Sequence, residues 1–196
     1  MTCLLPAVLS WILLELARNP VIQATLREEL LAFSGEPTYD QFTNNLPYLD
    51  AVVHETLRLH TPVTEIIRIV RFLLDHLHLS LTGHTTRQAT EDDVIPLSEP
   101  VRTQSGDLVD NITIAKGTKI GVSVACMNRS TAIWGPDAKE FQPERWLEED
   151  GIPKKAKEIQ GHRHILSFSD GPRICLGKGF AVAELKVSVL FAIDCL

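Results

Sequence analysis

The sequence predicts a mainly helical fold with small β-sheets. Apolar residues recur at helical spacing in several long stretches, whereas alternating and β-branched residues mark only short ones. The 196 residues suffice for one large domain, and no internal repeat divides them. We therefore expect a single domain over residues 1–196, with helices dominating and short strands between them.

The expected helices follow the apolar spacing and its breaks. The first covers about 6–17, and the second covers about 20–33 with Asn19 as its N-cap. A third spans 46–60 and is ended by a Thr-Pro pair. The last helix begins at about Gly177.

Short strands are expected near Thr64–Ile69 and Ile112–Val124. The second region contains AKGT, which predicts a hairpin turn between two paired strands. The stretch WGPDAKEFQPERWLEEDGIPKK is rich in proline, glycine and charge, so we expect a long ordered loop there.

Charge and cysteine usage exclude several classes of protein. A formal net charge of −6 argues against nucleic acid or an anionic membrane as the main partner. The four cysteines lie far apart without a CxxC pair, which excludes a zinc ribbon and a thioredoxin-type site. The chain starts and stops inside helical patterns, so we expect a piece of a longer protein.

The stretch FSDGPRICLGKGF places a lone cysteine, Cys175, just before a helix. Amide groups at a helix start can stabilise a thiolate, and a thiolate is a strong ligand for iron. Gly171 permits a tight turn, Gly177 lets the backbone approach a flat cofactor, and Phe168 can shield the sulfur. Arg173 can pair with a cofactor carboxylate.

The alternative interpretation of an isolated cysteine is a buried, inert thiol. The full pattern F-x-x-G-x-R-x-C-x-G, however, occurs by chance in a given window with a probability on the order of 10⁻⁷. With this loop the chain resembles the haem-thiolate monooxygenases of the cytochrome P-450 family. The resemblance implies that Cys175 is the axial iron ligand, whose electron donation favours cleavage of the O–O bond.

Two further motifs fit this resemblance. HETLRLH supplies Glu55 and Arg58 as an E-x-x-R pair on one helix face, although such a pair alone is more often a solvated surface ion pair. FQPERW supplies Arg145, which in the family joins the E-x-x-R pair in a buried network behind the haem. Two arginines sharing one glutamate leave excess positive charge, so we expect nearby carbonyls or water to contribute.

The resemblance covers nearly all of the chain but only the C-terminal part of the family's fold, and it is closest in character to fungal members. It implies haem b (iron protoporphyrin IX) as the cofactor, held by Cys175, Arg173, Phe168, Gly171 and Gly177. Arg68 is a further expected partner of a haem carboxylate.

The implied reaction inserts one oxygen atom from O2 into a small organic substrate, with electrons from NADPH through NADPH–cytochrome P-450 reductase. The implied location is the cytosolic face of the endoplasmic reticulum membrane, through an anchor outside this chain. The alternatives are a non-catalytic fragment that keeps only the haem-binding half, and a structural protein that uses the E-x-x-R network as a core.

Two departures from the family stand out. Counting back along the first helix, the family's acid–threonine pair falls on Cys3 and Leu4, which cannot relay a proton. Residues 70–88 interrupt two stretches that are nearly contiguous in the family, and we interpret them as a translated, unspliced intron. The three histidines of this insert lack the spacing of a metal site on a fixed element: His76, His78 and His84.

Overall fold

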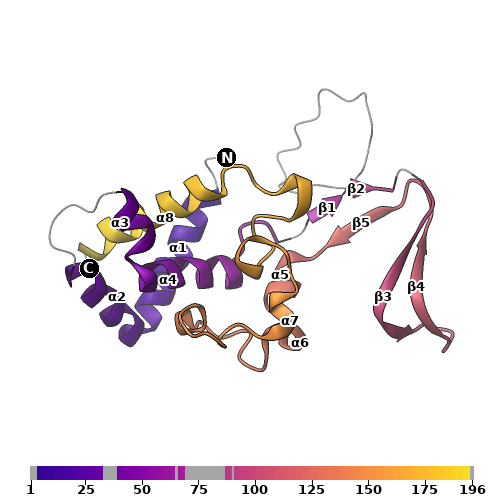
Figure 1. Ribbon diagram of the computed structural model, residues 1–196, viewed down its shortest axis with the longest axis horizontal. Helices are drawn as coiled ribbons and strands as arrows, with labels where there is room; N and C mark the ends of the chain where they lie inside the picture. The colour runs from indigo at the N-terminus through magenta and orange to yellow at the C-terminus, as the bar shows by residue number, and fades with distance from the viewer. Residues whose placement is uncertain (1–3, 33–38, 65, 69–86, 90, 195–196) are drawn as a thin grey trace. The chain divides into compact units, whose positions relative to one another are not determined.

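The structure, a computed structural model, describes residues 4–32, 39–64, 66–68, 87–89 and 91–194. It divides into two compact units (Figure 1). We call them the helical unit, Met1–Thr64 with Val124–Leu196, and the strand unit, Glu65–Ser123. The expected mixture of dominant helices and small sheets is confirmed.

The helical unit carries the α-helices of the described chain: α1 (Leu4–Arg18), α2 (Pro20–Ala32), α3 (Tyr39–Asn44), α4 (Pro47–Leu59), α5 (Val124–Asn128), α6 (Thr131–Trp134), α7 (Lys154–Lys157) and α8 (Lys178–Asp194). Short 3₁₀ turns interrupt the long segment before α8: η1 (Pro143–Trp146), η2 (His162–His164) and η3 (Gly171–Arg173). The segment expected to be a loop, 134–155, thus contains η1 and the first two residues of α7.

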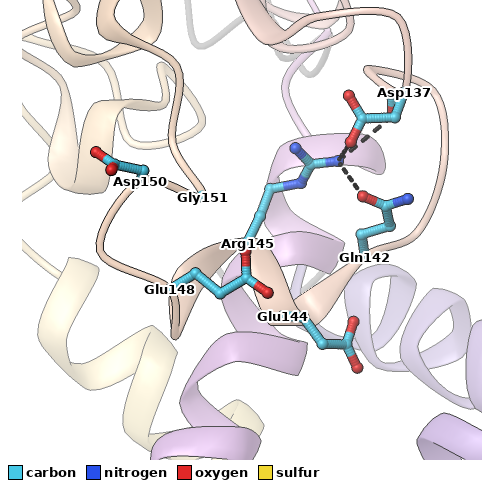
Figure 2. A pocket seen from close by; sticks show the side chains of 7 residues that line it. All are labelled: Asp137, Gln142, Glu144, Arg145, Glu148, Asp150 and Gly151. Atoms are coloured by element: carbon cyan, nitrogen blue, oxygen red, sulfur yellow. Dashed lines mark hydrogen bonds and ion pairs between the residues drawn. The ribbon is translucent and has the colours of Figure 1, made fainter.

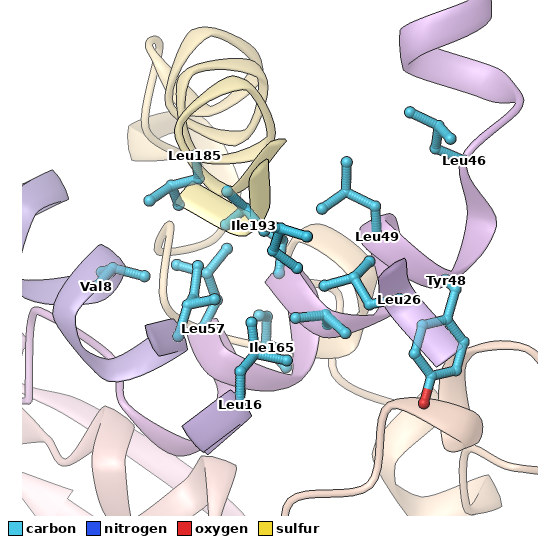
Figure 3. Close-up of a cluster of buried hydrophobic side chains, with 14 of the residues drawn as sticks. Val8, Leu16, Leu26, Leu46, Tyr48, Leu49, Leu57, Ile165, Leu185 and Ile193 are labelled. Carbon is cyan, nitrogen blue, oxygen red and sulfur yellow. The ribbon is translucent and has the colours of Figure 1, made fainter. Parts of the chain in front are cut away.

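Helix α4 lies at the centre of this unit. It contacts α1, α2, α8 and η1, and every residue from Tyr48 to Leu59 except Asp50 is buried. Its apolar side chains join those of α1 and α8 in one cluster, which Figure 3 shows around Leu57 and Leu185. Full burial of each such side chain contributes about 1.5–3 kcal/mol. The same helix also buries charged and polar side chains, which position the site described below.

The break between α1 and α2 departs from the expectation in one detail. Asn19 occupies the predicted N-cap position, and its carbonyl accepts the N–H of Gln23 at 3.0 Å. Its side-chain amide instead donates to the Glu15 carbonyl at 2.8 Å and so closes α1. No single described helix is long and apolar enough to cross a membrane; α1 and α2 pass that test only as a pair, bent by 110°.

The strand unit contains two small antiparallel sheets. One has the order β1 (Ile66–Arg68), β5 (Lys119–Val122), β2 (Arg87–Gln88), and the other pairs β3 (Asp93–Arg102) with β4 (Leu108–Ile114).

The predicted hairpin at AKGT is wrong. The turn itself is present, because the N–H of Thr118 donates to the Ala115 carbonyl at 3.0 Å. The strands on either side of it, however, belong to different sheets: β4 pairs with β3, and β5 pairs with β1 and β2. The long strand β3 offers β4 a fuller set of backbone partners than the four residues of β5 could.

Most of the predicted insert, residues 70–86, lies outside the described residues. Its last two residues, Arg87 and Gln88, form β2 and pair with Ile120 and Lys119 of β5.

Candidate functional site

The cysteine loop, Phe168–Cys175, is closed by a backbone hydrogen bond between its two ends. The N–H of Cys175 donates to the Phe168 carbonyl at 2.8 Å. Gly171 has φ +68°, a left-handed conformation that favours glycine, and its N–H donates to the Asp170 carboxylate at 2.6 Å. The turn η3 follows, closed by the N–H of Ile174 on the Gly171 carbonyl at 3.0 Å.

Helix α8 begins three residues after the cysteine, and the Gly177 carbonyl accepts the N–H of Ala181 in its first turn. Cys175 is partly buried and packs against the apolar core. Its neighbours Leu176 and Phe180 are large apolar side chains that are 101% and 72% exposed. A thiol at the start of a helix therefore lies in a segment rich in uncovered apolar surface.

The structure places the other predicted cofactor residues only in part. Phe168 is buried, and its ring meets the edge of His162 with centroids 5.6 Å apart. The side chain of Arg173 lies outside the described side chains, so its pairing with a carboxylate stays a prediction. Arg68 ends β1 of the strand unit, opposite Ile120, and its side chain is likewise not described.

The structure brings Glu55 and Arg58 together in a fully buried, bidentate ion pair. Arg58 Nε donates to Glu55 Oε2, and Arg58 Nη2 donates to Glu55 Oε1, each at 2.8 Å. Both side chains have 0% exposure, and the guanidinium also lies over the Trp134 ring at 5.0 Å. The alternative of a solvated surface pair is therefore excluded for these two residues.

Arg145 of η1 joins the same carboxylate, as the motif suggested. Its Nε donates to Glu55 Oε1 at 3.1 Å, and its Nη2 donates to Asp137 Oδ2 at 2.9 Å. Glu55 accepts two further hydrogen bonds, from the N–H of Gln142 and from Trp146 Nε1, each at 3.0 Å. The Glu55 carboxylate thus accepts hydrogen bonds from four different residues and connects α4 to η1.

The expected carbonyl contribution to the two arginines is present. The nitrogens of Arg58 donate to three backbone carbonyls: Asn128 at 2.8 Å, Ala138 at 2.6 Å and Glu140 at 3.1 Å. The second acid, Asp137, was not foreseen, because an acid eight residues before an arginine in a loop has no recognisable spacing.

Asn128 links this network to the cysteine loop. Its carbonyl accepts from Arg58, its side-chain amide donates to Ser167 Oγ at 3.0 Å, and its side-chain oxygen accepts the N–H of Leu166 at 3.2 Å. Ser167 Oγ in turn donates to the Leu57 carbonyl at 2.6 Å. The segment that enters the loop at Phe168 is therefore fixed to α4 and α5.

A polar hollow lies on the outer side of Arg145 (Figure 2). Its lining comes from the segment around η1: Asp137, Gln142, Glu144, Arg145, Glu148, Asp150 and Gly151. Asp137 is the ion-pair partner of Arg145, and Glu144 accepts the hydroxyl of Tyr48 at 2.7 Å. Hydrogen bonding to this acid and burial raise the pKa of Tyr48, burial being the larger cause. The hollow contains no residue of the cysteine loop.

Asp50 of α4 is the centre of a second, partly buried ion cluster. Its carboxylate lies 2.6 Å from Lys186 Nζ, 3.0 Å from Arg163 Nη2 and 3.3 Å from His54 Nδ1. Burial alone would raise the pKa of the Asp50 carboxyl, but hydrogen bonds and charge from His54 and Lys186 outweigh it and hold the pKa well below its usual range.

Replacing Asp50 with asparagine is expected to lower the free energy of unfolding by about 2 kcal/mol at neutral pH. The carboxyl has a lower pKa in the folded than in the unfolded chain, so its stabilisation is complete above about pH 4 and is lost as the pH falls through the folded pKa. Urea denaturation of both proteins at neutral and acidic pH measures this. A gap of equal size under both conditions would contradict the role of the carboxylate.

The residues around Cys175 fit a metal ion that is already bound by most of its ligands within a cofactor. Among the described residues no group of three or more histidine, cysteine, aspartate or glutamate side chains could hold a metal ion. Cys175 can supply one sulfur, and the exposed Leu176 and Phe180 offer apolar surface beside it. These features fit an iron that is held by a flat, apolar macrocycle and takes one sulfur ligand from the chain.

Comparison with known proteins tests the predicted family resemblance. The chain belongs to the cytochrome P-450 family, whose sequence profile matches residues 6–79 and 92–192. It is 54% identical over 180 residues to cytochrome P-450 monooxygenase claO, and 53% identical over 183 residues to claP, both of Ampulloclitocybe clavipes. It is 40% identical over 176 residues to cytochrome P-450 monooxygenase 91 of Postia placenta.

These matches cover 91%, 92% and 88% of this chain but only 30%, 30% and 29% of the relatives. The chain therefore spans about three tenths of the length of the curated relatives it matches. The predicted resemblance to fungal members is confirmed.

Proposed function

We propose that this chain forms the haem-binding part of a haem-thiolate monooxygenase, with the sulfur of Cys175 as the axial ligand of haem b. The observation that carries the proposal is the closed cysteine loop, whose partly buried thiol precedes α8 and lies beside exposed apolar side chains. The Glu55–Arg58–Arg145 network has a positioning role, because it fixes η1 and, through Asn128, the start of that loop.

Each group of the chain has a defined part in this proposal. Helix α8 begins three residues after Cys175, so its positive dipole end lies at the part of the chain that carries the sulfur. The Cys175 N–H is engaged by the Phe168 carbonyl, so the loop holds the sulfur in one orientation. Arg173 and Arg68 are proposed to pair with the haem carboxylates. When bound, haem iron supplies the oxygen activation that the family's reaction requires.

In this proposal the reaction inserts one oxygen atom from O2 into a small organic substrate. Electrons come from NADPH through NADPH–cytochrome P-450 reductase, at the cytosolic face of the endoplasmic reticulum. Membrane attachment is assigned to a segment outside this chain. The relatives claO and cytochrome P-450 monooxygenase 91 are named as monooxygenases, which supports this reaction class.

The full 196-residue chain is expected to bind haem saturably, with one haem per chain. Titrating haem into the purified chain and following its visible absorbance measures the stoichiometry, and the urea-unfolded chain is the control. Binding that does not saturate, or that is equal for the unfolded chain, would contradict the proposal.

A haem-binding chain without turnover is the second candidate, and one observation favours it. Leu4, which opens α1, takes a place where the family has one member of its proton-relaying pair, and an apolar side chain relays no proton. Substrate-dependent NADPH consumption with a reductase separates the two candidates, because only the monooxygenase consumes NADPH in response to substrate.

A further inference from the structure

Two histidines contact each other, and one of them also contacts the cysteine loop. His54 of α4 is 2% exposed, and His162 belongs to η2. Their Nε2 atoms lie 3.4 Å apart, and their ring centroids are separated by 5.5 Å. The pair connects two segments 108 residues apart in sequence.

The surroundings of His54 fix the proton on one of its two ring nitrogens. His54 Nδ1 lies 2.7 Å from the backbone oxygen of Asp50 and 3.3 Å from its carboxylate, and both are acceptors, so Nδ1 carries a proton. As long as only one of the two facing Nε2 atoms carries a proton, one ring donates to the other and the contact is a hydrogen bond. If both rings carry two protons, two N–H groups face each other and the hydrogen bond is lost.

Charges around the pair disfavour an added proton. The charged groups that face it come from α4, α8 and η2: Asp50, Lys178, Lys186 and Arg163. Three of the four are cations, and the single carboxylate is already shared by two of them. Burial, together with the charge of His54, Arg163 and Lys178, lowers the pKa of His162 to about 4.

The ring of His162 also contacts the start of the cysteine loop. It meets the Phe168 ring edge-on, with centroids 5.6 Å apart and planes at 73°. The carbonyl of the same Phe168 accepts the N–H of Cys175 at 2.8 Å. A continuous path of direct contacts therefore runs from α4 through His162 to the cysteine.

We propose that His162 is a positioning residue for Cys175, holding the cysteine loop through Phe168 while it is hydrogen-bonded to His54, and that this contact opens when both facing Nε2 atoms carry a proton. Its importance for catalysis rests on the proposed function of Cys175. The contact itself needs no haem. In the opened state His162 titrates near the ordinary histidine pKa of about 6.5, so acid favours opening.

The reactivity of the Cys175 thiol in the haem-free, full-length chain tests this proposal. Labelling with N-ethylmaleimide, resolved by peptide mass spectrometry, gives the rate for Cys175 relative to Cys126, an exposed thiol on α5. The ratio removes the part of the pH effect that the two thiols share, and the variants below measure the part that belongs to Cys175 alone. Between about pH 7.5 and pH 5 we expect this ratio to rise at least about threefold in the unaltered chain.

Two variants separate positioning from general packing. His162→Gln keeps an N–H donor but does not titrate in this range, so its ratio should rise less than that of the unaltered chain. The matched control is His60→Gln: His60 is also partly buried and stacked on an aromatic ring, that of Trp11 at 4.1 Å, but it pairs with Glu15. The His60→Gln variant should show the same rise in the labelling ratio at low pH as the unaltered chain.

A flat ratio in the unaltered chain overturns the proposal without any variant. A rise in His162→Gln equal to that of the unaltered chain overturns it as well. The readout needs no haem, so a failed haem titration overturns the proposed function, whereas a flat thiol ratio overturns the role of His162.

Discussion

Replacing Glu55 with alanine is expected to lower the free energy of unfolding by about 3–5 kcal/mol, a large fraction of the total stability of a typical domain. The substitution leaves the buried guanidinium groups of Arg58 and Arg145 without their shared carboxylate. It also leaves the Trp146 Nε1 and the Gln142 N–H without their acceptor. Urea denaturation followed by circular dichroism measures the change.

Two further variants make this result interpretable. Glu55→Gln keeps the shape and one acceptor oxygen but removes the charge, so we expect a loss smaller than that of alanine. Glu28, an exposed residue of α2, provides the matched control, because Glu28→Ala should change stability by no more than about 0.5 kcal/mol. If Glu55→Ala costs as little as Glu28→Ala, the network does not hold the fold together.

The second large effect is expected at the cysteine. Cys175→Ser should weaken haem binding by about a hundredfold or more, because a serine hydroxyl is not ionised at neutral pH and is a poor iron ligand. The apolar surface of Leu176 and Phe180 stays, so weak, non-specific binding should remain. Haem titrations of both proteins give the two dissociation constants.

Cys126→Ser is the control for this experiment, since it removes an exposed thiol of the same chain far from the loop in sequence. It should bind haem like the unaltered chain. Equal dissociation constants for Cys175→Ser and the unaltered chain would show that another group holds the haem, and urea denaturation would establish that both variants are folded.

Local sequence signals were sufficient for the helices and for part of the site. The apolar spacing of α4 predicted the helix, and the i, i+3 spacing predicted that Glu55 and Arg58 share a helix face and can meet. Their burial was not expected from the pair alone, because such a pair is more often solvated. Arg145 was reached only through the resemblance, because nothing in its own neighbourhood points to a glutamate 90 residues earlier. Asp137 and Asn128 complete the network through contacts that depend on the folded path of the chain.

The strands show why pairing is harder to predict than conformation. The turn at Ala115–Thr118 forms as its residues suggest, yet the strands it joins enter different sheets. Which strand a segment pairs with depends on the lengths and positions of all available partners, and a turn alone does not fix it. The His54–His162 contact likewise joins segments 108 residues apart and has no local signal.

The most direct test of the central claim is the absorbance of the haem-loaded chain after reduction and addition of carbon monoxide. A thiolate from Cys175 predicts a Soret band shifted strongly to the red, and Cys175→Ser should abolish that shift. A Soret band without the red shift in the unaltered, folded, haem-saturated chain would contradict the assignment of Cys175 as the axial ligand.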